Sequence, residues 1–167
     1  MTYAAQQYDF SDKRAGYEQL TTQLHGLLHG ETDPIANAAN TVALIFDALP
    51  DVSWAGFYFM RGGELIVGPF QGKPACVRIA LGRGVCGTAA ARRETLVVPD
   101  VNAFPGHIAC DAASQSEVVV PLIAADRVVG VLDLDSARLA RFDEADAHGL
   151  ERLAEQFLRA SRLEDLR

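Results

Sequence analysis

The segment Trp54-Ala-Gly-Phe-Tyr-Phe-Met60, with Arg61-Gly62-Gly63 and Glu64-Leu-Ile-Val67 after it, marks a change in the periodicity of the chain. Its aromatic residues are typical of a strand, and the glycine pair predicts a turn that joins two strands as a hairpin. Before this segment, apolar residues recur at helical spacing over residues 12–30 and 33–49. The sequence therefore predicts two helices followed by the start of a sheet.

More strands and two more helices are expected downstream. Strands are predicted at residues 75–79, 95–98, 117–123 and 127–135, a short helix at 88–92, and a last helix from Phe142. Residues 68–74 are too rich in glycine and proline to predict a central strand. Helices at both ends of a sheet with about six strands favour an α+β fold in one domain over residues 1–167, with a core of about 14–160. The terminal helices should pack on one face and leave the other face for a ligand.

Composition narrows the class of protein. The chain has 167 residues, is 49% hydrophobic and 22% charged, and carries a net charge of −7. These values are typical of a globular domain, and the negative charge argues against a nucleic-acid partner. Neither a secretory signal nor an apolar run of about 18 residues is seen, so we expect no membrane span and a cytoplasmic protein.

The strand at 127–135 places two carboxylates on one face, because side chains two positions apart share a face. If the preceding hairpin loop consists of residues 125–127, Glu117 lies opposite Asp135. Three acids would then converge, as an acidic rim in solvent or as a pocket that binds an ammonium group or donates a proton. The residues expected on this strand face are Val129, Val131, Asp133 and Asp135.

The three cysteines, Cys76, Cys86 and Cys110, fall in one block of 35 residues. Cys110 follows His107 in a long loop, which suits a reactive thiolate, whereas Cys76 and Cys86 suit core positions as well as a second redox thiol. Structural zinc sites use ligand pairs two to four residues apart, so we expect no metal here. Trp54 and Tyr58 share a strand face, either as core residues or as the wall of an apolar pocket.

Together these segments resemble the free methionine-(R)-sulfoxide reductases, which are stand-alone GAF-domain enzymes, over roughly residues 14–160. The segments that carry the resemblance are Trp54-Ala-Gly-Phe-Tyr58, Gly68-Pro-Phe-Gln-Gly-Lys-Pro-Ala-Cys76, Gly82-Arg-Gly-Val-Cys86-Gly87, Pro99-Asp-Val101, Phe104-Pro-Gly-His-Ile-Ala-Cys110-Asp111, Ser114-Gln-Ser-Glu117 and Leu132-Asp-Leu-Asp-Ser136.

This resemblance implies a six-stranded antiparallel sheet and a role for each conspicuous residue. Cys110 would be the nucleophile and Cys76 the resolving cysteine, with Cys86 as an alternative resolving or relay thiol. The acids Glu117, Asp133 and Asp135 and the aromatic residues Trp54 and Tyr58 would bind the substrate. The substrate would be free L-methionine-(R)-sulfoxide, reduced through a sulfenic acid and an intramolecular disulfide.

The implied reductant is thioredoxin, with no bound cofactor. A homodimer is expected by analogy with other GAF domains. The competing interpretation is a GAF module that binds a small molecule without chemistry. A sensor of that kind has no need of three cysteines.

Overall fold

The computed structural model describes residues 8–108 and 110–166. Residues 1–7, where we see no secretory signal, and Ala109 of the cysteine loop lie outside the described residues. A six-stranded antiparallel sheet has the order β3-β2-β1-β6-β5-β4. Its strands are β1 (Trp54–Arg61), β2 (Glu64–Gln71), β3 (Arg78–Ala80), β4 (Leu96–Val98), β5 (Ser116–Ala124) and β6 (Arg127–Ser136).

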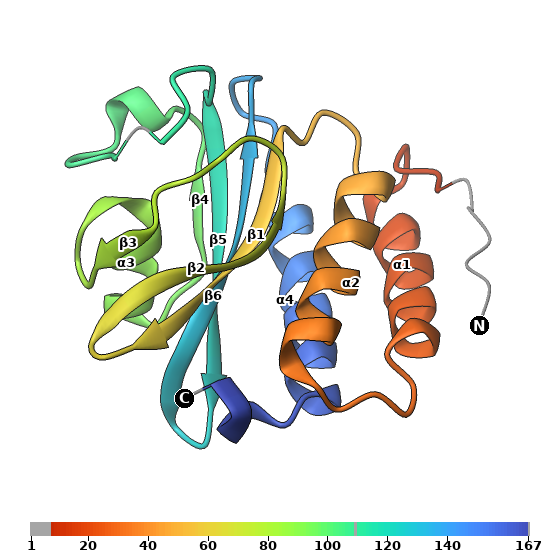
Figure 1. Cartoon of the computed structure of the whole chain (residues 1–167). Coiled ribbons are helices and arrows are strands. Elements are labelled where there is room, and N and C mark those ends of the chain that lie inside the picture. The colour runs from red at the N-terminus through yellow and green to blue at the C-terminus, as the bar shows by residue number, and fades with distance from the viewer. Residues whose placement is uncertain (1–7, 109, 167) are drawn as a thin grey trace.

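Helices cover both faces of this sheet (Figure 1). On one face α2 (Pro34–Ala48) and α4 (Glu144–Ala160) pack on the strands, and α1 (Lys13–Leu27) packs on these two helices. The other face carries α3 (Gly84–Arg92), and short 3₁₀ helices span Val101–Ala103 and Leu163–Leu166. The predicted α+β class, the antiparallel sheet and the packing of the terminal helices on one face are confirmed. Among the described residues, no helix is both long and apolar enough to cross a bilayer.

Side-chain caps explain where the long helices begin. Asp12, Asp33 and Asp143 each accept a hydrogen bond from a backbone N–H in the first turn of α1, α2 and α4. Such caps satisfy donors that have no partner inside the helix. In α2 the cap is followed by Pro34 at the first helical position, where the missing N–H of proline costs no hydrogen bond.

The buried face of α2 is not purely apolar. Ile35, an apolar residue in the first turn, is 43% exposed, whereas Asn37 and Thr41 are buried. The Asn37 side-chain amide donates to the Ser161 hydroxyl at 3.1 Å, and the Thr41 hydroxyl donates to the Asn37 carbonyl at 2.7 Å. These hydrogen bonds stabilise the two polar side chains in the core, although the Asn37 Oδ1 has no hydrogen-bond partner among the described residues.

Strand β2 corrects a second expectation, since it continues through Gly68, Pro69 and Phe70 to Gln71. Two features make proline acceptable there. The short strand β3 pairs only with residues 64–66, so this end of β2 has no strand on its outer side. The β1–β2 register also shifts between Gly56 and Tyr58, and prolines within sheets occur at such edges and bulges.

Two further boundaries differ. The third strand, predicted over residues 75–79, begins at Arg78, so Cys76 precedes it. The short helix, predicted from residue 88, begins at Gly84 and includes Cys86 in its first turn.

The β5–β6 hairpin has a shorter loop than expected but the expected register. Its turn has two residues, Ala125 and Asp126, both with positive φ. A bulge between Leu122 and Ile123 adds one residue to β6, and this restores the pairing of Glu117 with Asp135. Val129 takes up that extra position, so it packs with the helix-side core rather than sharing the face of Val131, as we expected.

A buried ionic cluster joins the first and last long helices. Asp146 in α4 is fully buried and accepts a hydrogen bond from the Tyr17 hydroxyl at 2.9 Å. Lys13 pairs with the same carboxylate, as does Arg141 at 3.3 Å. The Tyr17 ring lies against Gly149, where a Cβ would come within 2.2 Å of it. Two of these partners, Lys13 and Tyr17, belong to α1 and therefore fix its position on α4.

Replacing Asp146 by alanine should lower the free energy of unfolding by about 3 kcal/mol or more, because it leaves buried partners without their anion. The matched control on the same helix is Glu155→Ala, which removes an exposed pair with Arg159. That change should cost less than about 1 kcal/mol. Equilibrium denaturant unfolding measures the loss of stability in both variants. Equal losses would contradict a larger contribution of the buried cluster to the free energy of unfolding.

Candidate functional site

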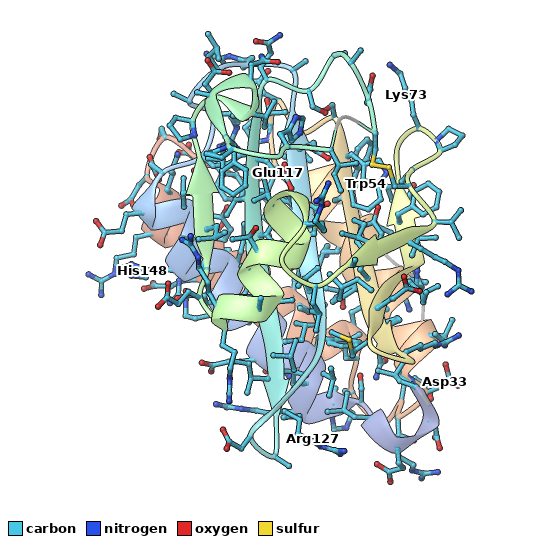
Figure 2. All side chains as sticks on the ribbon, turned by 90° about the vertical axis from the view of Figure 1, so that its left-hand side faces the viewer. Asp33, Trp54, Lys73, Glu117, Arg127 and His148 are labelled. Atoms are coloured by element: carbon cyan, nitrogen blue, oxygen red, sulfur yellow. A yellow bond between two sulfur atoms is a disulfide. The ribbon has the colours of Figure 1, made fainter. Side chains whose placement is uncertain are left out.

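A pocket lies on the face of the sheet opposite α1, α2 and α4. It is enclosed by β1, β5 and β6, the start of α3, and the loops that carry Cys76 and Cys110. Figure 2 faces this side and shows Lys73, Trp54 and Glu117 in its upper part, with a yellow disulfide nearby. Seven of the eight predicted site residues line this pocket: Trp54, Tyr58, Cys86, Cys110, Glu117, Asp133 and Asp135. The eighth, Cys76, is bonded to Cys110.

The three acids lie on adjacent strands and project into the pocket. Glu117 and Asp133 are only 6% and 5% exposed, so a solvent-facing acidic rim is the wrong interpretation. Burial and the neighbouring carboxyl groups raise the pKa of both side chains well above their usual range. Burial also raises the pKa of Asp135 to about 7, against an opposing hydrogen bond from Ser114. The cluster therefore retains protons near neutral pH.

Cys86 is the buried thiol of the pocket. Its Sγ donates a hydrogen bond to Glu117 Oε1 at 3.8 Å. Burial, together with the negative charges of Asp133 and Glu117, raises the pKa of Cys86 well above its usual value. A thiolate is the reactive form of cysteine, so this setting keeps Cys86 unreactive toward electrophiles.

Cys76 and Cys110 form a disulfide, with their Cα atoms 5.5 Å apart. The two loops are also joined by an ion pair between Lys73 and Asp111 at 3.0 Å. The Tyr58 hydroxyl donates to the Cys76 carbonyl at 3.1 Å and anchors the loop of Cys76 to the sheet. Cys110 itself is an exposed residue, whereas Cys76 is half-buried.

Trp54 and Tyr58 share the pocket face of β1, as predicted. The Trp54 ring stacks on Phe70, with ring centroids 5.4 Å apart, and its Nε1 donates to the Lys73 carbonyl at 3.0 Å. Gly56 makes this position possible, because a Cβ there would lie 2.3 Å from the Trp54 ring. Sequence reasoning missed Gly56, although a glycine inside a strand signals such a close approach.

His107 has a different neighbour from the one we expected for a residue that activates Cys110. Its Nε2 lies 3.9 Å from Glu117 Oε2, and burial lowers the pKa of the imidazole. A lowered pKa favours the neutral imidazole. His107 therefore lies beside the acids mainly as a neutral group that can form hydrogen bonds. Lys73 and Ser114 were also missed as individual residues, although both belong to segments that carry the family resemblance.

Comparison with known proteins agrees with this geometry. Residues 35–160 match the GAF domain family. The Escherichia coli free methionine-R-sulfoxide reductase is 50% identical over 145 residues, covering 87% of this chain and 88% of that protein. Protein YtsP of Bacillus subtilis is 55% identical over 151 residues, covering 89% and 93%.

A solved structure shows the same likeness in three dimensions. It is the free methionine-R-sulfoxide reductase of Neisseria meningitidis in complex with its substrate, with a TM-score of 0.90 and 46% identity. The alignment covers 95% of each chain. By sequence, fold and pocket, this chain belongs to the free methionine-R-sulfoxide reductases, a family of GAF-domain oxidoreductases.

Proposed function

We propose that this protein reduces free L-methionine-(R)-sulfoxide to L-methionine, with Cys110 as nucleophile, Cys76 as resolving cysteine and thioredoxin as reductant. The observation that carries the proposal is the Cys76–Cys110 disulfide beside a pocket lined by two buried acids, Glu117 and Asp133, and the half-buried Asp135. The electrons come from thioredoxin, so the cycle needs no bound cofactor. It suits the cytoplasm, where thioredoxin and glutathione keep thiols reduced.

The different environments of the thiols support Cys110 as the nucleophile. Cys110 is exposed in a loop at the pocket, whereas Cys86 is buried and donates its proton toward Glu117. Cys76 is within bonding distance of Cys110, so a sulfenic acid formed there has a resolving partner. The described structure gives Cys86 no disulfide, which supports a role outside the resolving step.

The first chemical step transfers oxygen from sulfoxide to thiol. The Cys110 sulfur attacks the sulfoxide sulfur, and a protonated member of the acid cluster gives a proton to the sulfoxide oxygen. The sulfur–oxygen bond of the substrate and the transient sulfur–sulfur bond to Cys110 both break, and the oxygen with its proton becomes bonded to the Cys110 sulfur. Methionine leaves, and Cys110 is then a sulfenic acid. The sulfoxide gains two electrons and Cys110 loses two.

The second step restores the thiols. The Cys76 thiol attacks the sulfenic sulfur, the new sulfur–sulfur bond forms, and water leaves with the oxygen. A dithiol of reduced thioredoxin then exchanges with this disulfide, so thioredoxin is oxidised and both cysteines return as thiols.

Selection of the free amino acid follows from the charge of the pocket. Ionised members of the acid cluster attract the α-ammonium of a free amino acid, while a peptide nitrogen carries no charge to offset the buried carboxylates. A site whose buried polar groups are left unpaired rejects such a substrate strongly. Trp54 and Tyr58 provide an apolar wall for the methyl end of the substrate.

The central test follows NADPH oxidation in the presence of thioredoxin, thioredoxin reductase and each methionine sulfoxide epimer. We expect turnover with the free R epimer only, and none in Cys110→Ser. The matched control is Cys86→Ser, which should remain able to form the Cys76–Cys110 disulfide. Activity that survives in Cys110→Ser would contradict the assignment of Cys110 as the nucleophile.

The resolving role is tested by Cys76→Ser under single-turnover conditions. This variant should release about one equivalent of methionine per protein and then stop, because its sulfenic acid has no resolving thiol. Quantifying methionine by chromatography, with and without thioredoxin, measures the burst and any cycling. Sustained cycling at the wild-type rate would move the resolving role to Cys86.

The raised pKa of Asp135 predicts a pH-dependent stability. Its folded-state pKa of about 7, above the ordinary value of 3.8, means that the folded protein binds more protons than the unfolded chain in this range. The contribution of Asp135 to stability is therefore complete at low pH and is lost as pH rises through about 7.

Asp135→Asn should accordingly gain a few degrees in Tm relative to wild type near pH 8, and less near pH 5. Thermal unfolding at both pH values measures this difference. The exposed acid variant Asp165→Asn is the control, and it should show no such trend. A gain that is larger at the lower pH would refute the direction of the shift.

A further inference from the structure

Cys86 is the one cysteine that the proposed cycle does not use, yet it lies among the acids of the pocket. Its Sγ, one carboxylate oxygen of Glu117 and one of Asp133 all lie within 4.8 Å of one another. All three side chains are buried, and they come from α3, β5 and β6. A thiol and two carboxylates are thus held together by the three elements that form one wall of the pocket.

Asp133 provides an independent sign that this cluster accommodates a cation. Its Oδ1 is buried and has no hydrogen-bond partner among the described residues. Buried carboxylate oxygens are normally paired, so an orphaned one lining a pocket indicates a ligand that supplies positive charge or donors.

An ammonium group would pair with the carboxylates but would make no use of the sulfur, whose thiol donates to Glu117. An ammonium donates hydrogen bonds to oxygen, whereas the sulfur of cysteine is a weak acceptor. A cysteine thiolate beside carboxylate oxygens is, by contrast, a suitable ligand set for Zn²⁺ and for related thiophilic divalent ions. The presence of Cys86 in the cluster therefore points to a second kind of cation.

We propose that Cys86, Glu117 and Asp133 bind a thiophilic divalent cation, such as Zn²⁺ or Cd²⁺, in competition with the amino acid substrate. The proposal rests on the proposed function only for the competition, since the ion would occupy the place of the substrate ammonium. It is an inhibitory site and has no role in the reaction.

The ligands and the charge balance fit such an ion. On binding, the sulfur–hydrogen bond of Cys86 breaks, the proton leaves to solvent, and a metal–thiolate bond forms, because a coordinating thiol is deprotonated outright. Glu117 and Asp133 likewise release to solvent any protons that they hold and then contribute negative charge, and His107 is available near Glu117 as a nitrogen ligand. The ligands lie 31 and 16 positions apart along the chain, which explains why the spacing of the cysteines gave no sign of them.

The disulfide-bonded protein provides a clean test, because Cys86 is then its only free thiol. Titration with Cd²⁺, followed by the ultraviolet thiolate-to-cadmium charge-transfer band, should show one saturable site. Cys86→Ser should abolish the band. Asp133→Asn should weaken binding by more than about tenfold, since loss of even an outer-shell partner costs roughly 10- to 100-fold.

The matched control is Glu155→Gln, an exposed carboxyl on α4, which should bind Cd²⁺ as wild type does. Free L-methionine-(R)-sulfoxide should displace the ion from the oxidised protein, which cannot reduce it. Circular dichroism of each variant checks that the fold is retained.

Three results would overturn the site: no band in wild type, a band that persists in Cys86→Ser, or a band unaffected by both Asp133→Asn and the sulfoxide. The last result would mean that Cd²⁺ binds the thiol alone. Sulfoxide reduction without a Cd²⁺ site would refute only this inference. A Cd²⁺ site in a protein with no reductase activity would refute the proposed function and leave the ion site intact.

Discussion

The pairing of β5 with β6 in a single register is the constraint on which the site depends. Glu117 lies opposite Asp135, and alternation along β6 puts Asp133 on the same face. A slip of one residue would turn the acids of one strand into the helix-side core and bring leucine into the pocket. The aromatic wall obeys the same constraint, because β1 pairs with β6 and sets Trp54 opposite Asp135.

Two groups of buried acids in this protein contrast in their partners. Asp146 is surrounded by a lysine, an arginine and a tyrosine hydroxyl, so its charge is balanced inside the fold. Among the described residues Asp133 has no ion pair with a lysine or arginine, and its neighbours include Glu117, Asp135 and the Cys86 thiol. The first arrangement stabilises helix packing. The second leaves charge to be balanced by a ligand, which is a common property of functional sites.

Much of this architecture follows from local rules in the sequence. The long helices were predicted from apolar spacing, and the convergence of the acids was predicted from the period of two along β6. The predicted pairing of Glu117 with Asp135 was correct, although the assumed three-residue loop was not. A two-residue turn and a bulge at Val129 together give the same pairing. Local pattern does not show how a bulge compensates for a turn.

Other features of the site depend on tertiary contacts that no local pattern contains. The bond between Cys76 and Cys110 spans 34 positions, and only the family resemblance suggested it. The contact of Cys86 with Glu117 joins a helix to a strand 31 positions away. The role of Gly56 depends on the path of the Trp54 ring, which is decided by its packing on Phe70.

The disulfide has a consequence for chain connectivity. The loop that it closes contains β3, α3 and β4, and therefore both edge strands of the sheet and the helix that crosses the pocket face. Closing a loop of this length removes roughly 4 kcal/mol of conformational entropy from the unfolded chain. In the proposed cycle this constraint is imposed after each oxidation and released at each reduction. The layer above the pocket would thus alternate between a tethered and an untethered state, while the three-helix layer behind the sheet lies outside the loop and keeps its connectivity.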